Sequence, residues 1–222
     1  LDRAQLSWMC QTYAALGIPP LVRIPSPDPH AATMVLDGGA AGIIAPYVES
    51  VEQVQSLRGA VKMRPIKGHK LQTMLAGESV GSELEHYIGV RASNRLLIVN
   101  IESVPAMDAL DDILQVPDLD GVLIEPHDLS CSLAVPEQYE HPIFLDACET
   151  IFRKARAAGV GAGIHFWGDV QQQTHLLNLG ANMLIHSADI SLFQRHLQLE
   201  LAAIRTAAGL SREATAISAP AI

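Results

Sequence analysis

Two polar residues, Asn100 and Glu102, end an otherwise apolar run at residues 96–102. Side chains alternate along a β-strand, so both residues are expected on the same face. In a barrel that face is the interior, where an unpaired carboxylate costs several kcal/mol. Glu102 therefore needs a buried partner, which could be a salt bridge or a metal ion.

A second group of polar residues follows another apolar run, where Glu125, His127 and Asp128 lie within four residues. Asp128 could be the N-cap of a short helix at 129–133, which would be worth ~1 kcal/mol. Alternatively, Asp128 and Glu102 offer two hard oxygen ligands of the kind that Mg²⁺ and Mn²⁺ prefer. Such a site leaves coordination positions open for substrate and water, as catalytic metal sites do.

Arg23 lies at the end of a third apolar run. It could form an ion pair at a barrel rim, or it could hold a carboxylate or an enolate by bidentate hydrogen bonds. His165 and His186 each end, or nearly end, a further run. We interpret these two histidines as hydrogen-bonded rim residues, with catalysis by either as the alternative.

Short β-rich runs that alternate with stretches of helical period position these residues. The segment Met63–Arg91 is the longest interruption of this pattern, and long connections are more often functional or flexible than structural. The expected strands are 21–24, 42–46, 95–102, 121–125, 159–166 and 182–187, and the expected helices are 4–16, 28–38, 50–58, 105–114, 142–158, 168–179 and 189–207.

Apolar strands separated by helices predict an α/β fold with a parallel sheet that is covered on both faces. Both an open doubly wound sheet and a (β/α)8 TIM barrel fit this pattern. Neither GxGxxG nor GxxxxGK[ST] occurs, and polar residues end several different strands, so the barrel is favoured. We expect one barrel domain over residues 1–207, without its first two strands, which would precede Leu1, and a C-terminal tail over 208–222.

Composition narrows the class of protein. The 222 residues are 49% hydrophobic, which is enough for a substantial core and excludes disorder as the main state. The net charge of −9 argues against nucleic acid or an anionic membrane surface as a partner. The chain has three cysteines without a CxxC pair, no 18-residue apolar run and no signal peptide. These features predict free thiols and a cytoplasmic location.

Taken together, these residues resemble the HpcH/HpaI aldolase and citrate lyase β-chain family. Members of that family are metal-dependent pyruvate aldolases on a (β/α)8 barrel of the phosphoenolpyruvate/pyruvate type. The resemblance covers nearly the whole chain, and the matching segments are 21–23, 44–50, 99–103, 120–130, 140–142 and 161–164.

The resemblance implies a role for each matching residue. Glu102 and Asp128 would hold the divalent metal, either Mg²⁺ or Mn²⁺, with Co²⁺ or Zn²⁺ as alternatives. Arg23 would be the catalytic residue that grips the pyruvyl group and stabilises its enolate. The residues implied at the substrate are Arg23, Asn100, Pro126, His127 and His165.

This chain departs from the family pattern in several places. Asn100 stands where the family commonly has Gln, and Glu125 stands where it has Gly. His165 stands at a usually apolar position on the aldehyde side. The acid-base histidine of the family lies upstream of the helix with which this chain opens, and residues 1–22 do not supply it.

The resemblance implies a lyase that cleaves or forms 4-hydroxy-2-oxo acids through a metal-bound pyruvate enolate. Its small-molecule substrates would be pyruvate or another 2-oxo acid together with an aldehyde, and it would be a homo-oligomer. Three alternatives stay open: decarboxylation of oxaloacetate, a citrate-lyase-like subunit that acts on an acyl-CoA ester, and an inactive barrel that lacks the acid-base histidine.

Overall fold

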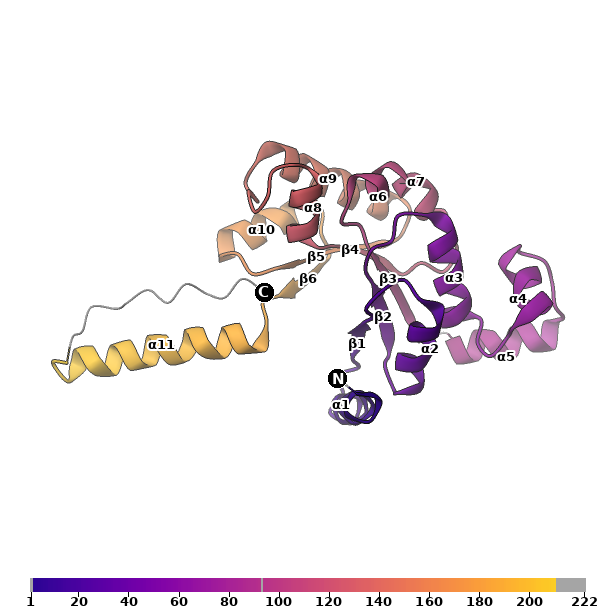
Figure 1. Cartoon of the computed structure of the whole chain (residues 1–222), viewed down its shortest axis with the longest axis horizontal. Coiled ribbons are helices and arrows are strands. Elements are labelled where there is room, and N and C mark those ends of the chain that lie inside the picture. The colour runs from indigo at the N-terminus through magenta and orange to yellow at the C-terminus, as the bar shows by residue number, and fades with distance from the viewer. Residues whose placement is uncertain (1, 93, 211–222) are drawn as a thin grey trace. The chain divides into compact units, whose positions relative to one another are not determined.

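A parallel β-sheet organises the computed structural model, which describes residues 2–92 and 94–210 (Figure 1). The strand order is β1-β2-β3-β4-β5-β6, and the pairs from β1 to β5 are parallel. An order that follows the sequence is typical of a barrel, whereas a doubly wound sheet reverses its order at a switch point. The strands are β1 (Leu21–Arg23), β2 (Gly42–Ala45), β3 (Leu96–Asn100), β4 (Gly121–Ile124), β5 (Gly161–Phe166) and β6 (Met183–His186).

All six expected strands are confirmed, each slightly shorter than predicted, and the strand order rules out the doubly wound alternative. The two strands expected before Leu1 stay a prediction. The close spacing of β2 and β3 depends on Gly42, since a Cβ atom there would lie 2.5 Å from the Leu96 carbonyl oxygen.

The seven expected helical regions are also confirmed, with one split in two and three further helices. The region 105–114 forms two short helices instead of one, and α4 and α5 occupy most of the segment predicted as a long interruption. The helices are α1 (Arg3–Ala15), α2 (Pro29–Asp37), α3 (Val51–Lys62), α4 (Gly68–Leu75), α5 (Ser82–Ala92), α6 (Val104–Asp108), α7 (Leu110–Ile113), α8 (Pro126–Ser132), α9 (Pro142–Ala157), α10 (Val170–Asn178) and α11 (Asp189–Ala207).

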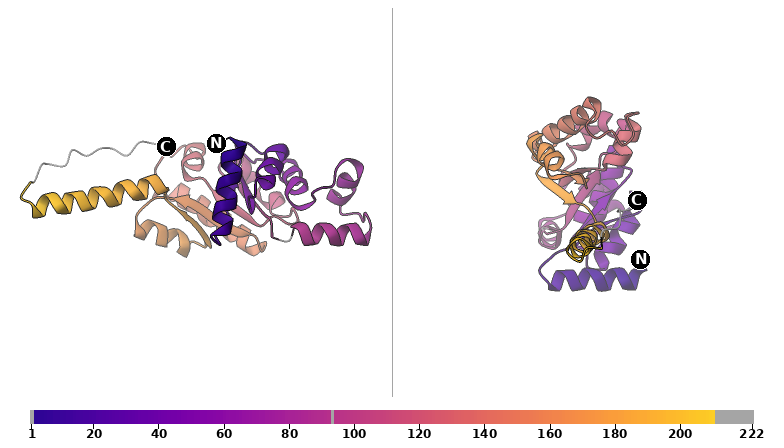
Figure 2. Two further views of the ribbon diagram at one scale, coloured as in Figure 1. Left: turned by 90° about the horizontal axis from the view of Figure 1, so that it is seen from below. Right: turned by 90° about the vertical axis from the view of Figure 1, so that its left-hand side faces the viewer.

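The two faces of the sheet have different surroundings. Alternate strand residues such as Ile43, Val99 and Ile124 belong to the large core that the helices cover. The other face carries a small apolar cluster of Ile44, Ile98 and Leu123. Helix α1 packs against α2, and α4 and α5 pack against α3 (Figure 2). The inner face therefore carries the residues that end β1, β3, β4 and β5.

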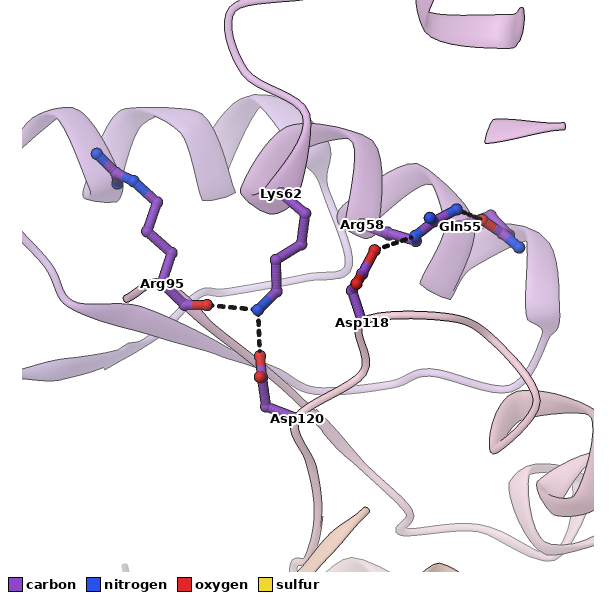
Figure 3. Close-up of polar contacts among 6 residues, drawn as sticks. All are labelled: Gln55, Arg58, Lys62, Arg95, Asp118 and Asp120. Atoms are coloured by element: carbon purple, nitrogen blue, oxygen red, sulfur yellow. Dashed lines mark hydrogen bonds and ion pairs between the residues drawn. The ribbon is translucent and has the colours of Figure 1, made fainter. Parts of the chain in front are cut away.

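Ion pairs fix the opposite, amino-terminal ends of β3 and β4 (Figure 3). Lys62 Nζ lies 2.7 Å from Asp120 Oδ2 and donates to the Arg95 carbonyl oxygen at 2.6 Å. Asp120 also accepts the Leu97 N–H at 2.6 Å. The Lys62 side chain is only 12% exposed, so it links helix α3 to both strands from a nearly buried position.

We expect Lys62→Met to lower the free energy of unfolding by about 2 kcal/mol, because it leaves the partly buried Asp120 carboxylate without its cation. Thermal denaturation should show a drop of roughly 4–8 °C in Tm. Lys154→Met is the matched control, since Lys154 pairs with Asp111 at 2.8 Å on the surface. The control should cost less than about 1 kcal/mol, and an equal loss in both variants would contradict the prediction.

The chain divides into two compact units, Leu1–Ile185 and His186–Ile222. The first contains almost the whole sheet and every residue proposed for the site, while α11 belongs to the second. Most of the predicted tail at 208–222 lies outside the described residues. None of the helices in the described ranges is long and apolar enough to cross a membrane.

Candidate functional site

The carboxylate of Glu102 is the centre of the candidate site. Glu102 follows β3 and is only 4% exposed. Its Oε1 accepts the Tyr47 backbone N–H at 2.6 Å, and its Oε2 accepts Asn100 Nδ2–H at 2.8 Å. Both oxygens are thus held in place by neutral donors, so the predicted shared face of Asn100 and Glu102 is confirmed by direct contact.

Burial raises the pKa of the Glu102 carboxyl above its usual range, and the nearby Asp128 carboxylate adds to this effect. The hydrogen bonds from Asn100 and Tyr47, and the charge of Arg23, act in the opposite direction. Asp128 and Arg23 are therefore both close enough to influence Glu102. A divalent cation would favour the ionised form, since it supplies the opposite charge that a buried carboxylate lacks.

The loop after β2 reaches Glu102 through a backbone conformation that the sequence does not reveal. Tyr47 has φ +57°, the left-handed region that bulky residues rarely adopt. Ser103 Oγ–H donates to Glu49 Oε1 at 2.6 Å, which ties this loop to the end of β3. Ser50 then starts α3 with a capping box to Gln53. These contacts hold the strained Tyr47 amide against Glu102, a role that our sequence analysis missed.

Arg23 ends β1 with an exposed side chain, as predicted. Its guanidinium carbon lies 6.0 Å from the centroid of the Tyr47 ring, in the range of a cation–π contact. Tyr47 therefore contributes twice to the site, with its N–H to Glu102 and with its ring to Arg23. The ring also restricts where the guanidinium can lie.

Helix α8 carries Pro126, His127 and Asp128, and its start corrects one expectation. The helix begins at Pro126 with Glu125 as its N-cap, so Asp128 is in the first turn and is not the N-cap of a helix at 129–133. Proline suits the first helical position because its φ is already helical and its missing N–H needs no partner there. The earlier start turns Asp128 from a capping residue into one whose charge acts on Glu102.

The contacts of His127 are made on α8 and the loop after it. Its Nδ1 lies 3.6 Å from Glu137 Oε1, and its Nε2 lies 4.0 Å from Cys131 Sγ. The predicted substrate contacts of Pro126 and His127 stay predictions.

His165 faces the inside of the sheet from the end of β5, and its Nδ1 lies 3.8 Å from Glu125 Oε1. Its ring meets the Trp167 ring in a T-shaped arrangement with centroids 4.5 Å apart. His186 falls in the second unit of the chain and is not part of the site that we describe.

The donor set fits a hard divalent cation. Glu102 and Asp128 supply carboxylate oxygens, and Asn100 Oδ1 is a buried acceptor without a hydrogen-bond partner among the described residues. Within the described ranges, no three side chains of His, Cys, Asp or Glu group closely enough to form a complete metal cage. A cation here would complete its coordination with water or substrate oxygens, as Mg²⁺ usually does.

Residues 3–195 match the HpcH/HpaI aldolase/citrate lyase family. The chain belongs to this family. The match spans every strand and all of the site residues above, so the family resemblance inferred from the sequence is confirmed.

Named relatives of this family member agree with that assignment. It is 32% identical to 2-keto-3-deoxy-L-rhamnonate aldolase from Escherichia coli K12 over 197 residues, which is 88% of this chain and 73% of the relative. Among solved structures, an HpcH/HpaI aldolase from Desulfitobacterium hafniense DCB-2 gives a TM-score of 0.77 at 26% identity, with 92% of this chain and 79% of that chain covered. Family and relatives together identify a lyase.

A more distant structure shares only the fold. It is a citrate lyase β subunit from M. tuberculosis, solved in complex with oxaloacetate and magnesium. Its TM-score is 0.50 at 14% identity, with 78% of this chain and 71% of that chain covered.

Proposed function

We propose that this lyase is a divalent-metal-dependent aldolase that cleaves or forms 4-hydroxy-2-oxo acids through the enolate of pyruvate. The observation that carries the proposal is the buried Glu102 carboxylate, which is held by two neutral donors and lies near both Asp128 and Arg23. A buried carboxylate without a bonded cation is costly, and a metal offsets that cost.

Each residue has a distinct task in this reaction. Glu102 and Asp128 would hold Mg²⁺ or Mn²⁺, which when bound acts as a Lewis acid toward the 2-oxo acid. In the cleavage direction the C3–C4 bond breaks, its electron pair forms the enolate, and the C4 hydroxyl loses its proton as the aldehyde forms. Arg23 would bind the negative charge that develops on the pyruvyl oxygens, where a planar guanidinium fits two oxygens at once.

The test is release of pyruvate from 2-keto-3-deoxy-L-rhamnonate, because the name of the E. coli relative gives that compound as the first substrate to try. We expect pyruvate release with Mn²⁺ or Mg²⁺, loss of activity after EDTA, and recovery when the metal is restored. Failure to release pyruvate from this and other 4-hydroxy-2-oxo acids, at any metal concentration, would contradict the proposed aldolase.

Decarboxylation of oxaloacetate is a second candidate, favoured by the oxaloacetate and magnesium bound in the M. tuberculosis structure of the same fold. It needs the same enolate and the same residues but no aldehyde. Measuring pyruvate release from oxaloacetate beside the aldol substrate separates the two activities. Activity toward oxaloacetate alone would favour the second candidate.

The proposal includes a homo-oligomer, which is supported by helix α11. None of its described side chains is buried, and Ile190, Phe193, Leu197 and Ile204 are exposed at a helical spacing that puts them on one face. Such a face is usually covered by another surface.

A further inference from the structure

Glu125 and His165 lie beside each other on neighbouring strand ends. Ile124 of β4 pairs with Ile164 of β5, and Glu125 and His165 are the next residue of each strand pair. Glu125 Oε1 and His165 Nδ1 are 3.8 Å apart, and the two side chains are 14% and 28% exposed. The pair is therefore partly shielded from water but still accessible to a small molecule.

The orientation of Glu125 differs from the usual behaviour of a residue in its place. Glu125 is the N-cap of α8, yet its side chain makes no capping hydrogen bond to the helix. Its carboxylate lies instead near His165 on the inner face of the sheet. Local helix stability thus does not explain the position of this carboxylate.

Trp167 adds an aromatic surface to the pair. Its ring packs edge to face against His165 with centroids 4.5 Å apart, and the residue is 47% exposed. A carboxylate accepts hydrogen bonds from hydroxyl groups, and an indole packs against C–H groups. This combination suits a short hydroxylated carbon chain, whereas the negative charge of Glu125 repels an anionic one.

The strand register relates this cluster to the metal-binding carboxylates. Asn100 of β3 pairs with Leu123 of β4, so the same offset puts Glu102 level with Glu125. His165 is one strand farther, and two strand spacings amount to roughly 10 Å. Arg23 lies on the other side of Glu102, at the end of β1. A 2-oxo acid bound through Glu102 and Arg23 would therefore extend its remaining carbons toward Glu125 and His165.

We infer that Glu125, His165 and Trp167 form the subsite for the aldehyde half of the substrate and select an uncharged hydroxylated aldehyde over an anionic one. This inference rests on the proposed aldolase function. It assigns the two residues as specificity determinants, with Glu125 accepting a hydrogen bond from a substrate hydroxyl and His165 positioning the Glu125 carboxylate.

The experiment compares the full chain with Glu125→Gln and His165→Gln in two assays with Mn²⁺. The first, decarboxylation of oxaloacetate, needs no aldehyde and reports on the pyruvyl half of the site. The second measures aldol addition of pyruvate to glyceraldehyde, which is uncharged and hydroxylated, and to succinic semialdehyde, which is anionic. We expect Glu125→Gln to lower kcat/KM for glyceraldehyde about 10-fold and to raise it for succinic semialdehyde.

The controls make each outcome decisive. Glu200→Gln removes a similar carboxylate, 3.4 Å from His196 on α11, and should leave both assays unchanged. Decarboxylation by Glu125→Gln and His165→Gln should stay within about twofold of the parent chain. If Glu125→Gln changes both aldehydes equally, or changes decarboxylation as much as addition, the subsite is wrong while the aldolase proposal stands. If the parent chain neither decarboxylates oxaloacetate nor adds pyruvate to an aldehyde, the proposed function and the subsite both fail.

Discussion

Glu102→Gln is expected to lower metal-dependent kcat/KM by about 10³-fold or more, because Lewis-acid stabilisation is worth several kcal/mol. Glutamine keeps the length of the side chain and one carbonyl oxygen for the Tyr47 N–H, but it has no charge for a divalent cation. The measurement is pyruvate release over a range of Mn²⁺ concentrations. Recovery of full activity at high Mn²⁺ would show that Glu102 is not a metal ligand.

Thermal stability gives a second readout of the same substitution. Mn²⁺ at 100 times its Kd should stabilise the parent chain by about 2.7 kcal/mol and should not stabilise Glu102→Gln. Without metal, the variant should be the more stable protein near neutral pH, because the raised pKa of Glu102 means that folding disfavours its ionised form. This advantage should shrink as the pH falls and Glu102 becomes protonated in both states.

Glu85→Gln is the matched control for Glu102→Gln. Glu85 also accepts one side-chain hydrogen bond, from Ser79 Oγ at 2.7 Å, and one backbone N–H, from Val80 at 2.9 Å. It lies on α5 in an exposed position, so it should change neither the activity nor the response to Mn²⁺. A loss of activity in both variants would point to a general effect of removing carboxylates.

The polar strand ends were predictable because strand alternation has a fixed period. Asn100 and Glu102 are two residues apart after an apolar run, and their contact at 2.8 Å follows from that spacing. Strand order was also accessible, since β-rich runs separated by helices leave few topologies. The pairing of Glu125 with His165 was not accessible, because it depends on the register between two strands that are distant in sequence.

Tyr47 marks the limit of sequence reasoning at this site. Its contribution to Glu102 comes from a backbone N–H in the left-handed region, and any residue type could supply that N–H. The start of α8 was misjudged for a related reason. Asp128 is a good N-cap type, but Pro126 favours the first helical position and moves the start of the helix toward Glu125.

Arg23→Lys is expected to lower kcat/KM for 4-hydroxy-2-oxo acid cleavage by about 10²–10³-fold, the usual cost of removing one oxyanion-stabilising donor. Lysine keeps the positive charge, so it tests the planar guanidinium, which binds two oxygens at once and packs on the Tyr47 ring at 6.0 Å. Because Glu102 and Asp128 are unchanged, stabilisation by Mn²⁺ should persist. The pair of readouts separates loss of enolate binding from loss of the metal.

Arg91→Lys is the matched control for Arg23→Lys, since Arg91 lies over the Tyr87 ring at 5.6 Å on α5. It should leave turnover unchanged, because the same exchange of cation is made far from Glu102 along the sheet. If Arg23→Lys retains turnover within about threefold of the parent chain, the guanidinium does not bind the developing enolate. Arg23 would then be the rim ion-pair residue that the sequence left open. Loss of Mn²⁺ stabilisation in Arg23→Lys would instead mean that its charge acts mainly by keeping Glu102 ionised.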